Sequence, residues 1–298
     1  MFLTNDLTEP VLEEAIQQSA DLIISYHPPL FRPFKRLTSR SWKERIAVRC
    51  CEEKIAVYSP HTSWDCIHGG INTWLLEPYG PGEARPVTVT SSPRYPDNVS
   101  HSVSVHGVPV TTEQLTPLLT MAGIYVSVDQ TSVTVGCAQS QLASVMSALP
   151  AELRQAARVT QHCKPPLENT GAGRLLTLTT PNTVEAALQL TKTHLAMSHL
   201  RVALGQGRDM TSSVASVAVC AGSGASVLTG VGADLVVTGE MSHHEVLDMV
   251  SEGVTVILAD HSNTERGYLA RVRDKLAPVL PGVNIVISQV DRDPLEIM

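Results

Sequence analysis

The sequence predicts an α/β fold of two similar α/β halves with mainly parallel sheets, separated by a small α+β insertion. Near both ends of the chain, short runs of Val, Ile, Leu and Ala alternate with amphipathic helical segments, which is typical of parallel strands covered on both faces. The central stretch IYVSVDQTSVTVGC instead alternates apolar with polar residues, as an antiparallel hairpin with one solvent-exposed face does. We therefore expect a first half at residues 1–98, an insertion at 99–168 and a second half at 169–298.

The first half carries recognisable strand and helix signals. Its expected elements are, in order, the strand MFLTND, a helix after Thr8, the strand ADLIISYH, a helix after Ser41 and the strand KIAVYS. Pro10 falls in the first turn of the first helix, where its missing N–H removes no hydrogen bond. Ser41 and Glu44 have the spacing of a capping box at the start of the second helix.

Changes of composition separate the insertion from both halves. Between Pro78 and Asn98 the chain is rich in Pro, Gly, Ser and Arg, and HCKPPLENTGAG marks the second boundary. The insertion is expected to run as strand, helix, strand, strand and helix through SVSVHGV, TTEQLTPLLTMAG, IYVSVDQ, TSVTVGC and AQSQLASVMSAL. The second half returns to alternating strands and helices through GRLLTLTT, VEAALQLTKTHLAM, HLRVALG, SVASVAVC, DLVVTGE, VTVILADH and NIVISQV.

Composition and charge exclude several classes of protein. The chain has 43% hydrophobic and 17% charged residues, as soluble globular proteins do, and no run approaches the ~20 apolar residues that span a bilayer. The net charge of −7 argues against direct nucleic-acid binding, which favours a basic surface. The six cysteines contain no CxxC pair and no signal peptide is visible. We therefore expect reduced thiols and a cytoplasmic location, with the nucleus as a second one.

Imidazole and carboxylate side chains follow the expected strands at their carboxyl ends, where parallel sheets bind ligands. They are His27, His61, Asp65, Glu240, His243, His244, Asp260, His261 and Glu265. Pro28 and Pro29 each restrict the preceding backbone to an extended conformation, so His27 is held in one orientation just beyond the sheet, as a metal ligand must be. The alternative, a turn histidine that faces water, stays open and better explains His27 taken alone.

Helix capping offers a second explanation for some of these carboxylates. Ser262 to Glu265 fits the pattern S-x-x-E, so Glu265 is explained equally well as a helix cap. Ser242 to Glu245 fits the same pattern, and we interpret Glu245 as a cap. The glycine-rich turn AGSGAS at residues 221–226 offers amides to a phosphate. It lacks the lysine of a P-loop, so close packing of strand on helix is the preferred interpretation.

The chain contains the pieces SYHPPLF, SPHTSWD, GRL, CAGSGAS, TGEMSHHEVLD and DHSNTERGYL. Together they resemble the NGG-interacting-factor-three-like (Nif-three-like) family, whose bacterial members are labelled GTP cyclohydrolase 1 type 2 homologues. The resemblance extends from the first strand to the last helix and implies two similar α/β halves with an insertion. Family members also carry a segment before the first strand that is not present here, so we expect a shortened form or a piece of a longer protein.

The resemblance implies a two-metal site between the two halves. Carried over by position, His27, Asp65 and Glu265 would hold one divalent ion. His261 and Glu265 would hold a second, with Glu265 bridging the two. Carboxylate and imidazole ligands suit Fe, Mn, Zn or Mg. The bacterial pattern has a second histidine before the one that matches His27, and Tyr26 stands there in this chain. Because a phenol with a pKa of about 10 is a poor ligand at neutral pH, we expect one or two ions per chain.

For function, the resemblance supports two hypotheses. The first is an adaptor or transcriptional corepressor-type interaction protein that retains a divalent-metal site between its halves, because eukaryotic relatives are described as partners of transcriptional co-regulators. The alternative is a metal-dependent hydrolase that acts on a nucleotide-like or phosphorylated small molecule. The expected partners are further copies of the chain, as a dimer or higher homo-oligomer, and transcriptional co-regulator proteins. Direct binding to nucleic acid or to a membrane is not expected.

Overall fold

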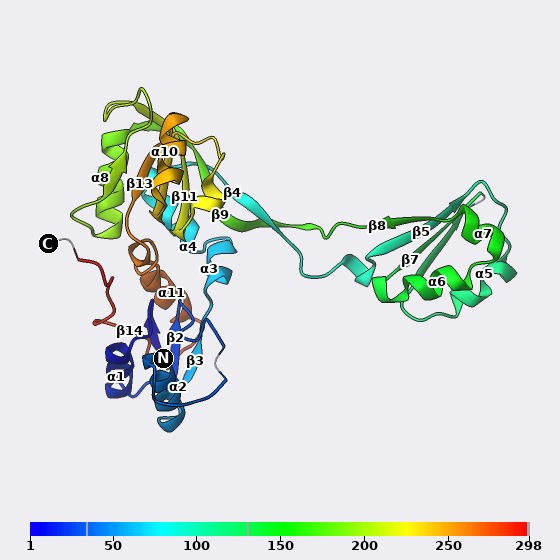
Figure 1. The fold of residues 1–298 in the computed structure, drawn as a ribbon, viewed down its shortest axis with the longest axis horizontal. Coiled ribbons are helices and arrows are strands. Elements are labelled where there is room, and N and C mark those ends of the chain that lie inside the picture. The colour runs from blue at the N-terminus through cyan, green and yellow to red at the C-terminus, as the bar shows by residue number, and fades with distance from the viewer. Residues whose placement is uncertain (34, 130, 297–298) are drawn as a thin grey trace. The chain divides into compact units, whose positions relative to one another are not determined.

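The computed structural model describes residues 1–33, 35–129 and 131–296, which form two compact units (Figure 1). The larger unit contains residues 1–89 and the chain from 169 onward, and the smaller unit contains residues 90–168. The larger unit has one parallel and one mixed sheet, and the smaller unit has an antiparallel sheet. This confirms the mixed α/β class that the alternating strands and helices predict.

The first sheet of the larger unit is parallel. Its strand order is β14 (Val286–Ile287), β1 (Phe2–Thr4), β2 (Leu22–Ser25) and β3 (Ala56–Tyr58). Helices α1 (Glu9–Gln17) and α2 (Trp42–Glu52) pack on this sheet through one buried apolar cluster. At the start of α2, Ser41 and Glu44 form the predicted capping box. The segment NIVISQV, which the sequence placed with the second half, contributes β14 to the first sheet, where β14 pairs with β1.

The second sheet is mixed. Its strand order is β10 (Arg201–Ala203), β13 (Thr255–Leu258), β12 (Leu235–Glu240), β11 (Ser213–Ser223), β9 (Pro166–Thr183) and β4 (Gly82–Ser91). Strands β11, β12 and β13 are parallel, whereas β9 and β10 run antiparallel to β11 and β13. This departs from the expectation of mainly parallel sheets. The physical reason is that a parallel pair needs a crossover connection, and β11–β12 and β12–β13 are the neighbours in this sheet that follow one another in the chain with a single helix between them.

One core joins the two sheets of the larger unit. Its remaining helices are α3 (Thr62–Cys66), α4 (Ile71–Leu76), α8 (Val184–Leu195), α9 (Ala225–Leu228), α10 (His243–Ser251) and α11 (Tyr268–Leu276), with the 3₁₀ turns η1 (Glu77–Tyr79) and η4 (Ser262–Thr264). Leu3 and Ile24 of the first sheet belong to the same buried cluster as Trp74, Val217 and Leu235. Because close-packed interiors are rigid, this shared core holds the ends of β2 and β13 in fixed positions relative to each other.

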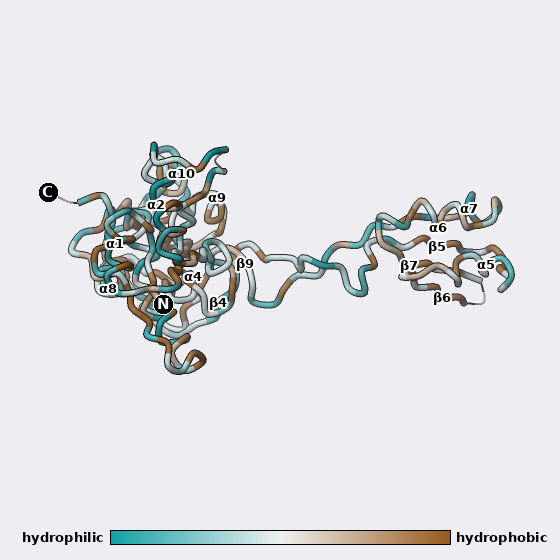
Figure 2. Tube along the Cα trace, turned by 90° about the horizontal axis from the view of Figure 1, so that it is seen from below, coloured by the Kyte–Doolittle hydropathy of each residue, from teal (hydrophilic) through white to brown (hydrophobic). Residues whose placement is uncertain are grey.

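The smaller unit is an antiparallel sheet with helices packed against it. Its strand order is β6 (Tyr125–Asp129), β7 (Ser132–Cys137), β5 (His101–His106) and β8 (Arg158–Gln161). Its helices are α5 (Thr112–Leu119), α6 (Leu142–Ala148) and α7 (Ala151–Ala156), with the 3₁₀ turns η2 (Pro96–Asn98) and η3 (Gln139–Gln141). Strands β6 and β7 pair antiparallel, which confirms the predicted hairpin. Alternate residues of β5 and β7 enter one apolar core, and hydrophobic residues recur along the strands of this unit in Figure 2. Over the described part of the chain, every helix is too short or too polar to traverse a bilayer.

Candidate metal centre

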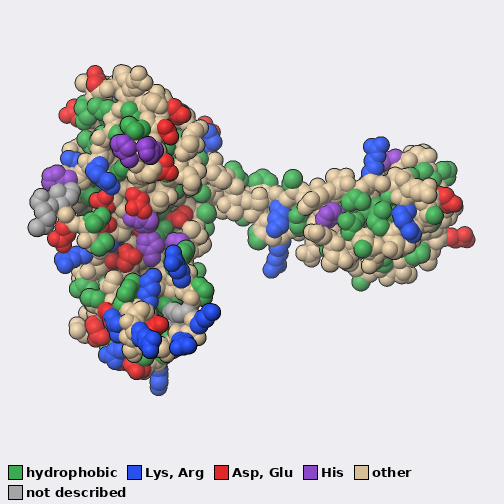
Figure 3. Space-filling view, in the orientation of Figure 1, with side chains coloured by type: hydrophobic (Ala, Val, Ile, Leu, Met, Phe, Trp, Pro, Cys, Tyr) green, Lys and Arg blue, Asp and Glu red, His purple; other side chains and the backbone are tan. Residues whose placement is uncertain are grey.

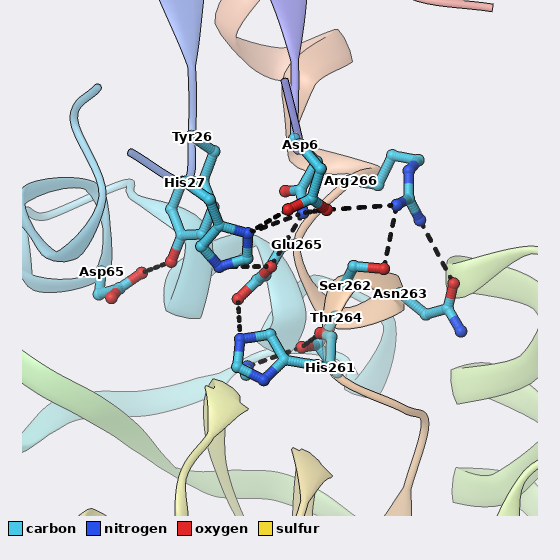
Figure 4. Close-up of polar contacts among 12 residues, drawn as sticks. Asp6, Tyr26, His27, Asp65, His261, Ser262, Asn263, Thr264, Glu265 and Arg266 are labelled. Carbon is cyan, nitrogen blue, oxygen red and sulfur yellow. Dashed lines mark hydrogen bonds and ion pairs between the residues drawn. The ribbon is translucent and has the colours of Figure 1, made fainter. Parts of the chain in front are cut away.

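Two histidines and one glutamate converge between the two sheets of the larger unit. His27 follows β2, whereas His261 and Glu265 flank η4 after β13 (Figure 4). Ligand atoms of the three side chains lie within 4.8 Å of one another. The Nε2 atom of His27 is 3.4 Å from Oε2 of Glu265, and the Nε2 atom of His261 is 3.3 Å from Oε1 of the same carboxylate. This is a possible metal site, and its ion is not identified by the geometry.

The local backbone fixes both histidines. The amide of His27 donates to the carbonyl oxygen of Asn5 at 2.9 Å, so the chain beyond β2 stays aligned with the chain beyond β1. Asp260 adopts the left-handed region, with a φ of 59°, which turns the chain sharply at the end of β13. The hydroxyl of Thr264 then donates to the carbonyl oxygen of His261 at 2.7 Å. These contacts place both imidazoles at the carboxyl ends of their strands, where sequence reasoning expects them.

Each imidazole is oriented through its other ring nitrogen. Nδ1 of His27 lies 2.9 Å from Oδ1 of Asp6, and Nδ1 of His261 lies 2.8 Å from Oε1 of Glu240. A carboxylate that accepts the Nδ1 proton directs Nε2 toward the site, so that Nε2 can bind a metal once its own proton is displaced, which is the arrangement found around metal-ligating histidines. Sequence reasoning noted Glu240 and missed Asp6. Asp6 could have been found by applying the strand-end rule to MFLTND, since it follows β1 as His27 follows β2.

Glu265 is a ligand candidate and does not act as a helix cap. Its side chain is 2% exposed, and its Oε2 accepts a 3.1 Å hydrogen bond from Nδ2 of Asn5. The hydroxyl of Ser262 donates to Asp293 and forms no capping box with Glu265, and α11 begins three residues after Glu265, at Tyr268. The capping alternative for Glu265 is therefore wrong. Glu245 does form a capping box with Ser242 in α10, as predicted.

The electrostatics of the cluster are those of a buried anion between two cations. Burial would raise the pKa of Glu265, but hydrogen bonds from His261 and His27 hold it below its ordinary value. Burial lowers the pKa of His27, yet Asp6 and Glu265 raise it overall to about 10. Glu265 raises the pKa of His261 to about 9, against the effect of burial. A divalent cation that displaces one proton from each imidazole would leave the charge of the cluster unchanged.

The surroundings of Glu265 fit a bound cation. The Oδ1 atom of Asn5 is buried and has no hydrogen-bond partner among the residues that the structure describes. Gly222 faces the cluster, and a Cβ atom there would lie 2.8 Å from both Oε1 of Glu265 and Nε2 of His261. Only glycine leaves this space free, and its φ of +66° also favours glycine. With oxygen and imidazole nitrogen donors, the set suits a divalent ion such as Fe, Mn or Zn.

Asp65, the fourth predicted ligand, pairs with Tyr26 rather than with the two histidines. Its Oδ1 accepts a 2.6 Å hydrogen bond from the hydroxyl of Tyr26, a residue that is 2% exposed. Burial raises the pKa of Asp65 to about 6, although the Tyr26 hydrogen bond opposes this. Burial and the nearby carboxylates of Glu265 and Asp65 also raise the pKa of Tyr26, so its phenol stays protonated. Of the four predicted ligands, the structure brings together His27, His261 and Glu265, and it pairs Asp65 with Tyr26. Metal binding by all four stays a prediction.

Two other predicted features are accounted for by local contacts. In the turn AGSGAS, the amides of Gly222 and Gly224 donate to the hydroxyls of Thr264 and Thr238. These amides are therefore not free to receive a phosphate, which agrees with the preferred packing interpretation. His243 and His244 begin α10 and contact each other, with ring centroids 5.5 Å apart.

The metal centre opens into a cavity of about 840 Å³. His27, His61 and His261 line its floor together with Asp6 and Glu240. Figure 3 shows histidine side chains reaching the surface of the larger unit, among acidic and basic ones. A volume of this size is in the range of small-molecule sites, so His27 and His261 are accessible from the cavity.

Comparison with known proteins identifies the family. The model of the Duf34/NIF3 (NGG1p interacting factor 3) family matches residues 1–294. The chain is 44% identical to NIF3-like protein 1 of Bos taurus and 43% identical to that of Homo sapiens, over 311 residues that cover 100% of this chain and 82% of each relative. Its fold is similar to the crystal structure of a Bacillus cereus protein related to NIF3, with 25% identity and a TM-score of 0.64 over 100% of this chain and 88% of that one. The chain belongs to the Duf34/NIF3 family.

Proposed function

We propose that this protein binds a divalent metal ion through His27, His261 and Glu265 and that the bound ion serves hydrolysis of a small molecule in the adjoining cavity. The observation that supports this most strongly is the orientation of the two imidazoles. Asp6 and Glu240 engage both Nδ1 atoms, and both Nε2 atoms face the buried carboxylate of Glu265. Histidines that served only to form ion pairs with Glu265 would not need a second carboxylate each.

The residues of the chain have distinct roles in this proposal. A divalent ion, when bound, lowers the pKa of a coordinated water and polarises an oxygen of the substrate. Glu265 supplies the negative charge that holds the ion, and Asn5 keeps its carboxylate in place through the hydrogen bond to Oε2. Asp6 and Glu240 fix the ring orientation and the tautomer of the two histidines.

His61 is suited to accept a proton in the same cavity. Its ring centroid lies 5.6 Å from that of His27. Burial holds its pKa below the ordinary value, and the positive charge of His27 adds to this, so the imidazole is neutral at neutral pH. Its φ of 44° is a conformation that L-residues rarely adopt, and such strain is concentrated at functional sites. We assign His61 the role of general base in the proposed hydrolysis.

Metal analysis of the protein, purified without added metal or chelator, tests the first step of this proposal. We expect about one divalent ion per chain, which is lost in the variant His261→Ala. A metal-free preparation that takes up no Mn²⁺, Zn²⁺ or Fe²⁺ at micromolar concentration would contradict the proposal. Hydrolase activity should disappear with chelation and return with the same ion.

The second candidate is an adaptor or transcriptional corepressor-type interaction protein that retains the metal site. The family is described as an NGG1p interacting factor, and the hydrogen bond from Tyr26 engages Asp65, a carboxylate that a two-metal reaction would require. In this case the partners are transcriptional co-regulator proteins, and the chain works as a homo-oligomer in the cytoplasm or nucleus. Binding of a co-regulator that persists in His261→Ala, together with absence of any hydrolase activity, would favour this candidate.

A further inference from the structure

One wall of the cavity at the metal centre is aromatic and apolar, in contrast to the ionisable side chains around the candidate ligands. This wall is formed by the segment between β2 and α2 and by the first residues of α2, including Pro29, Phe31 and Trp42. Phe31 is 70% exposed and Trp42 is 42% exposed, although both are large apolar residues. Exposed aromatic rings that line a concave surface are typical of ligand sites. The rings offer flat faces on which a planar group can stack.

The charged side chains that line the cavity differ in whether they already have a partner in the fold. The carboxylates of Asp6, Glu240 and Asp260 are already engaged by His27, His261 and Arg201 respectively. Asp293 accepts a hydrogen bond from Ser262. These four negative side chains of the cavity lining are therefore occupied by partners within the fold.

The ammonium group of Lys43 is available to bind an anionic ligand. Its Nζ lies 5.2 Å from the centroid of the Trp42 ring, and among the described residues no carboxylate lies within ion-pair distance of it. Across the cavity, Arg292 has only a 3.9 Å contact with Glu296. In a chain of net charge −7, Lys43 thus presents positive charge beside the aromatic surface, and Arg292 adds a second cation to the cavity lining. Basic side chains gather below the histidines in Figure 3, over the first sheet.

We propose that the cavity takes a small aromatic anion, whose ring packs on Trp42 and Phe31 and whose anionic group is held by Lys43. This deepens the proposed function, and it rests on that function for the part of the ligand that reaches the metal centre. A cationic ligand would be repelled by Lys43 and would find the carboxylates occupied. A plain inorganic anion would leave the aromatic wall uncovered. A carboxylate or a phosphate ester on an aromatic ring satisfies both features.

Three matched probes test this proposal by equilibrium dialysis, with the nitroaromatic absorbance as the readout. They are 4-nitrobenzoate, 4-nitrophenyl phosphate and the neutral 4-nitrobenzyl alcohol. We expect at least one of the two anions to bind roughly tenfold more tightly than the alcohol. The carboxylate and phosphate arms distinguish the two kinds of anionic group. Equal binding of the alcohol and both anions would overturn the proposal.

Two pairs of variants assign the binding to this wall. Lys43→Gln should weaken anion binding roughly tenfold and leave the alcohol unchanged, whereas Lys35→Gln, in the segment that precedes α2 and not lining the cavity, should change nothing. Trp42→Ala should weaken all three probes, and Trp42→Phe should restore most of the loss. Identical effects of Lys43→Gln and Lys35→Gln would contradict the assignment. Lys43 and Trp42 are partly exposed, and circular dichroism establishes that each variant is folded.

Metal content, measured on the same samples, separates this inference from the proposed function. Metal-loaded protein that binds none of the anions would contradict the aromatic-anion site but not the proposed metal centre. Protein that holds no metal and still binds the anions through Lys43 would contradict the metal-dependent function but not the anion site.

Discussion

The hydroxyl of Tyr26 donates a 2.6 Å hydrogen bond to the carboxylate of Asp65. Burial, together with the negative charges of Glu265 and Asp65, keeps this phenol protonated, so Tyr26 acts as a hydrogen-bond donor to Asp65 at the place where the bacterial pattern has an imidazole. The pair lies next to His27, with the Tyr26 and His27 ring centroids 4.9 Å apart. We infer that Tyr26 limits the centre to one ion by engaging the carboxylate that a second ion would use.

Replacing Tyr26 by histidine should therefore create a second metal position. The change Tyr26→His frees Asp65 and adds a neutral nitrogen donor, so calorimetric titration with Mn²⁺ should show a new binding step, with about two ions per chain in place of about one. Tyr26→Phe frees Asp65 without adding a ligand, so it separates the two contributions: a second step in this variant too would assign the limit to the hydrogen bond on Asp65 alone. A titration of Tyr26→His that is identical to that of the parent would show that Tyr26 does not limit occupancy.

Replacing Glu265 by glutamine should abolish metal binding. The amide keeps the shape but loses the charge that stabilises a divalent ion in a buried site. We expect the metal content to fall sharply and the chelator-dependent shift of the melting temperature to vanish, because only binding to the folded state produces that shift. Glu245→Gln, at the capping box of α10, should keep full metal content. Full metal content in Glu265→Gln would exclude this residue as a ligand.

Metal affinity should rise with pH. In the metal-free protein the pKa of His27 is about 10 and that of His261 about 9, so both imidazoles are protonated at neutral pH. An ion must displace these protons, and about two should be released for each ion bound. The apparent affinity therefore rises as pH increases from 6 toward 9 and levels off above the higher pKa. Calorimetry in buffers of different ionisation enthalpy measures the proton count, and a count near zero would contradict imidazole ligation.

Removing either carboxylate that orients a histidine should weaken metal binding. Asp6→Ala and Glu240→Ala each leave one Nδ1 without its acceptor, and loss of such a partner typically costs about 10- to 100-fold in metal affinity. Glu9→Ala is the control, since it removes an exposed carboxylate that pairs with Arg45 of α2. Competition with a fluorescent chelator gives the affinities. Unaltered affinity in both variants would mean that the imidazoles are oriented without these carboxylates.

Arg174 should be required for stability. It is 3% exposed and donates to five backbone carbonyls, including those of Cys66 and Ile67 directly after Asp65. Lysine cannot supply the same planar set of donors, so Arg174→Lys should lower the free energy of unfolding by about 2 kcal/mol or more. Arg271→Lys, at an exposed ion pair with Glu77, should have an effect below about 1 kcal/mol. Urea unfolding of the two variants provides the comparison.

Local sequence by itself determines the fold class, one hairpin, two of the candidate ligands and one helix cap of this protein. Alternating strand and helix segments determine the α/β class, and period-two alternation determines the β6–β7 hairpin. The strand-end rule identifies His27 and His261, because the carboxyl end of a strand is a local property of the chain. Likewise Ser242 and Glu245 form a capping box, whose contacts all lie within one helical turn.

Tertiary structure decided the rest. Ser262 and Glu265 have the same spacing as Ser242 and Glu245, yet Glu265 is buried as a ligand candidate while Glu245 is a partly exposed cap. The difference comes from Asn5, which donates to Glu265 across 260 positions of sequence, and from His27, which contacts the same carboxylate. A four-residue pattern contains no information about what packs over it. Whether a carboxylate caps a helix or faces two imidazoles is therefore determined only when the shared core brings the ends of β1, β2 and β13 together.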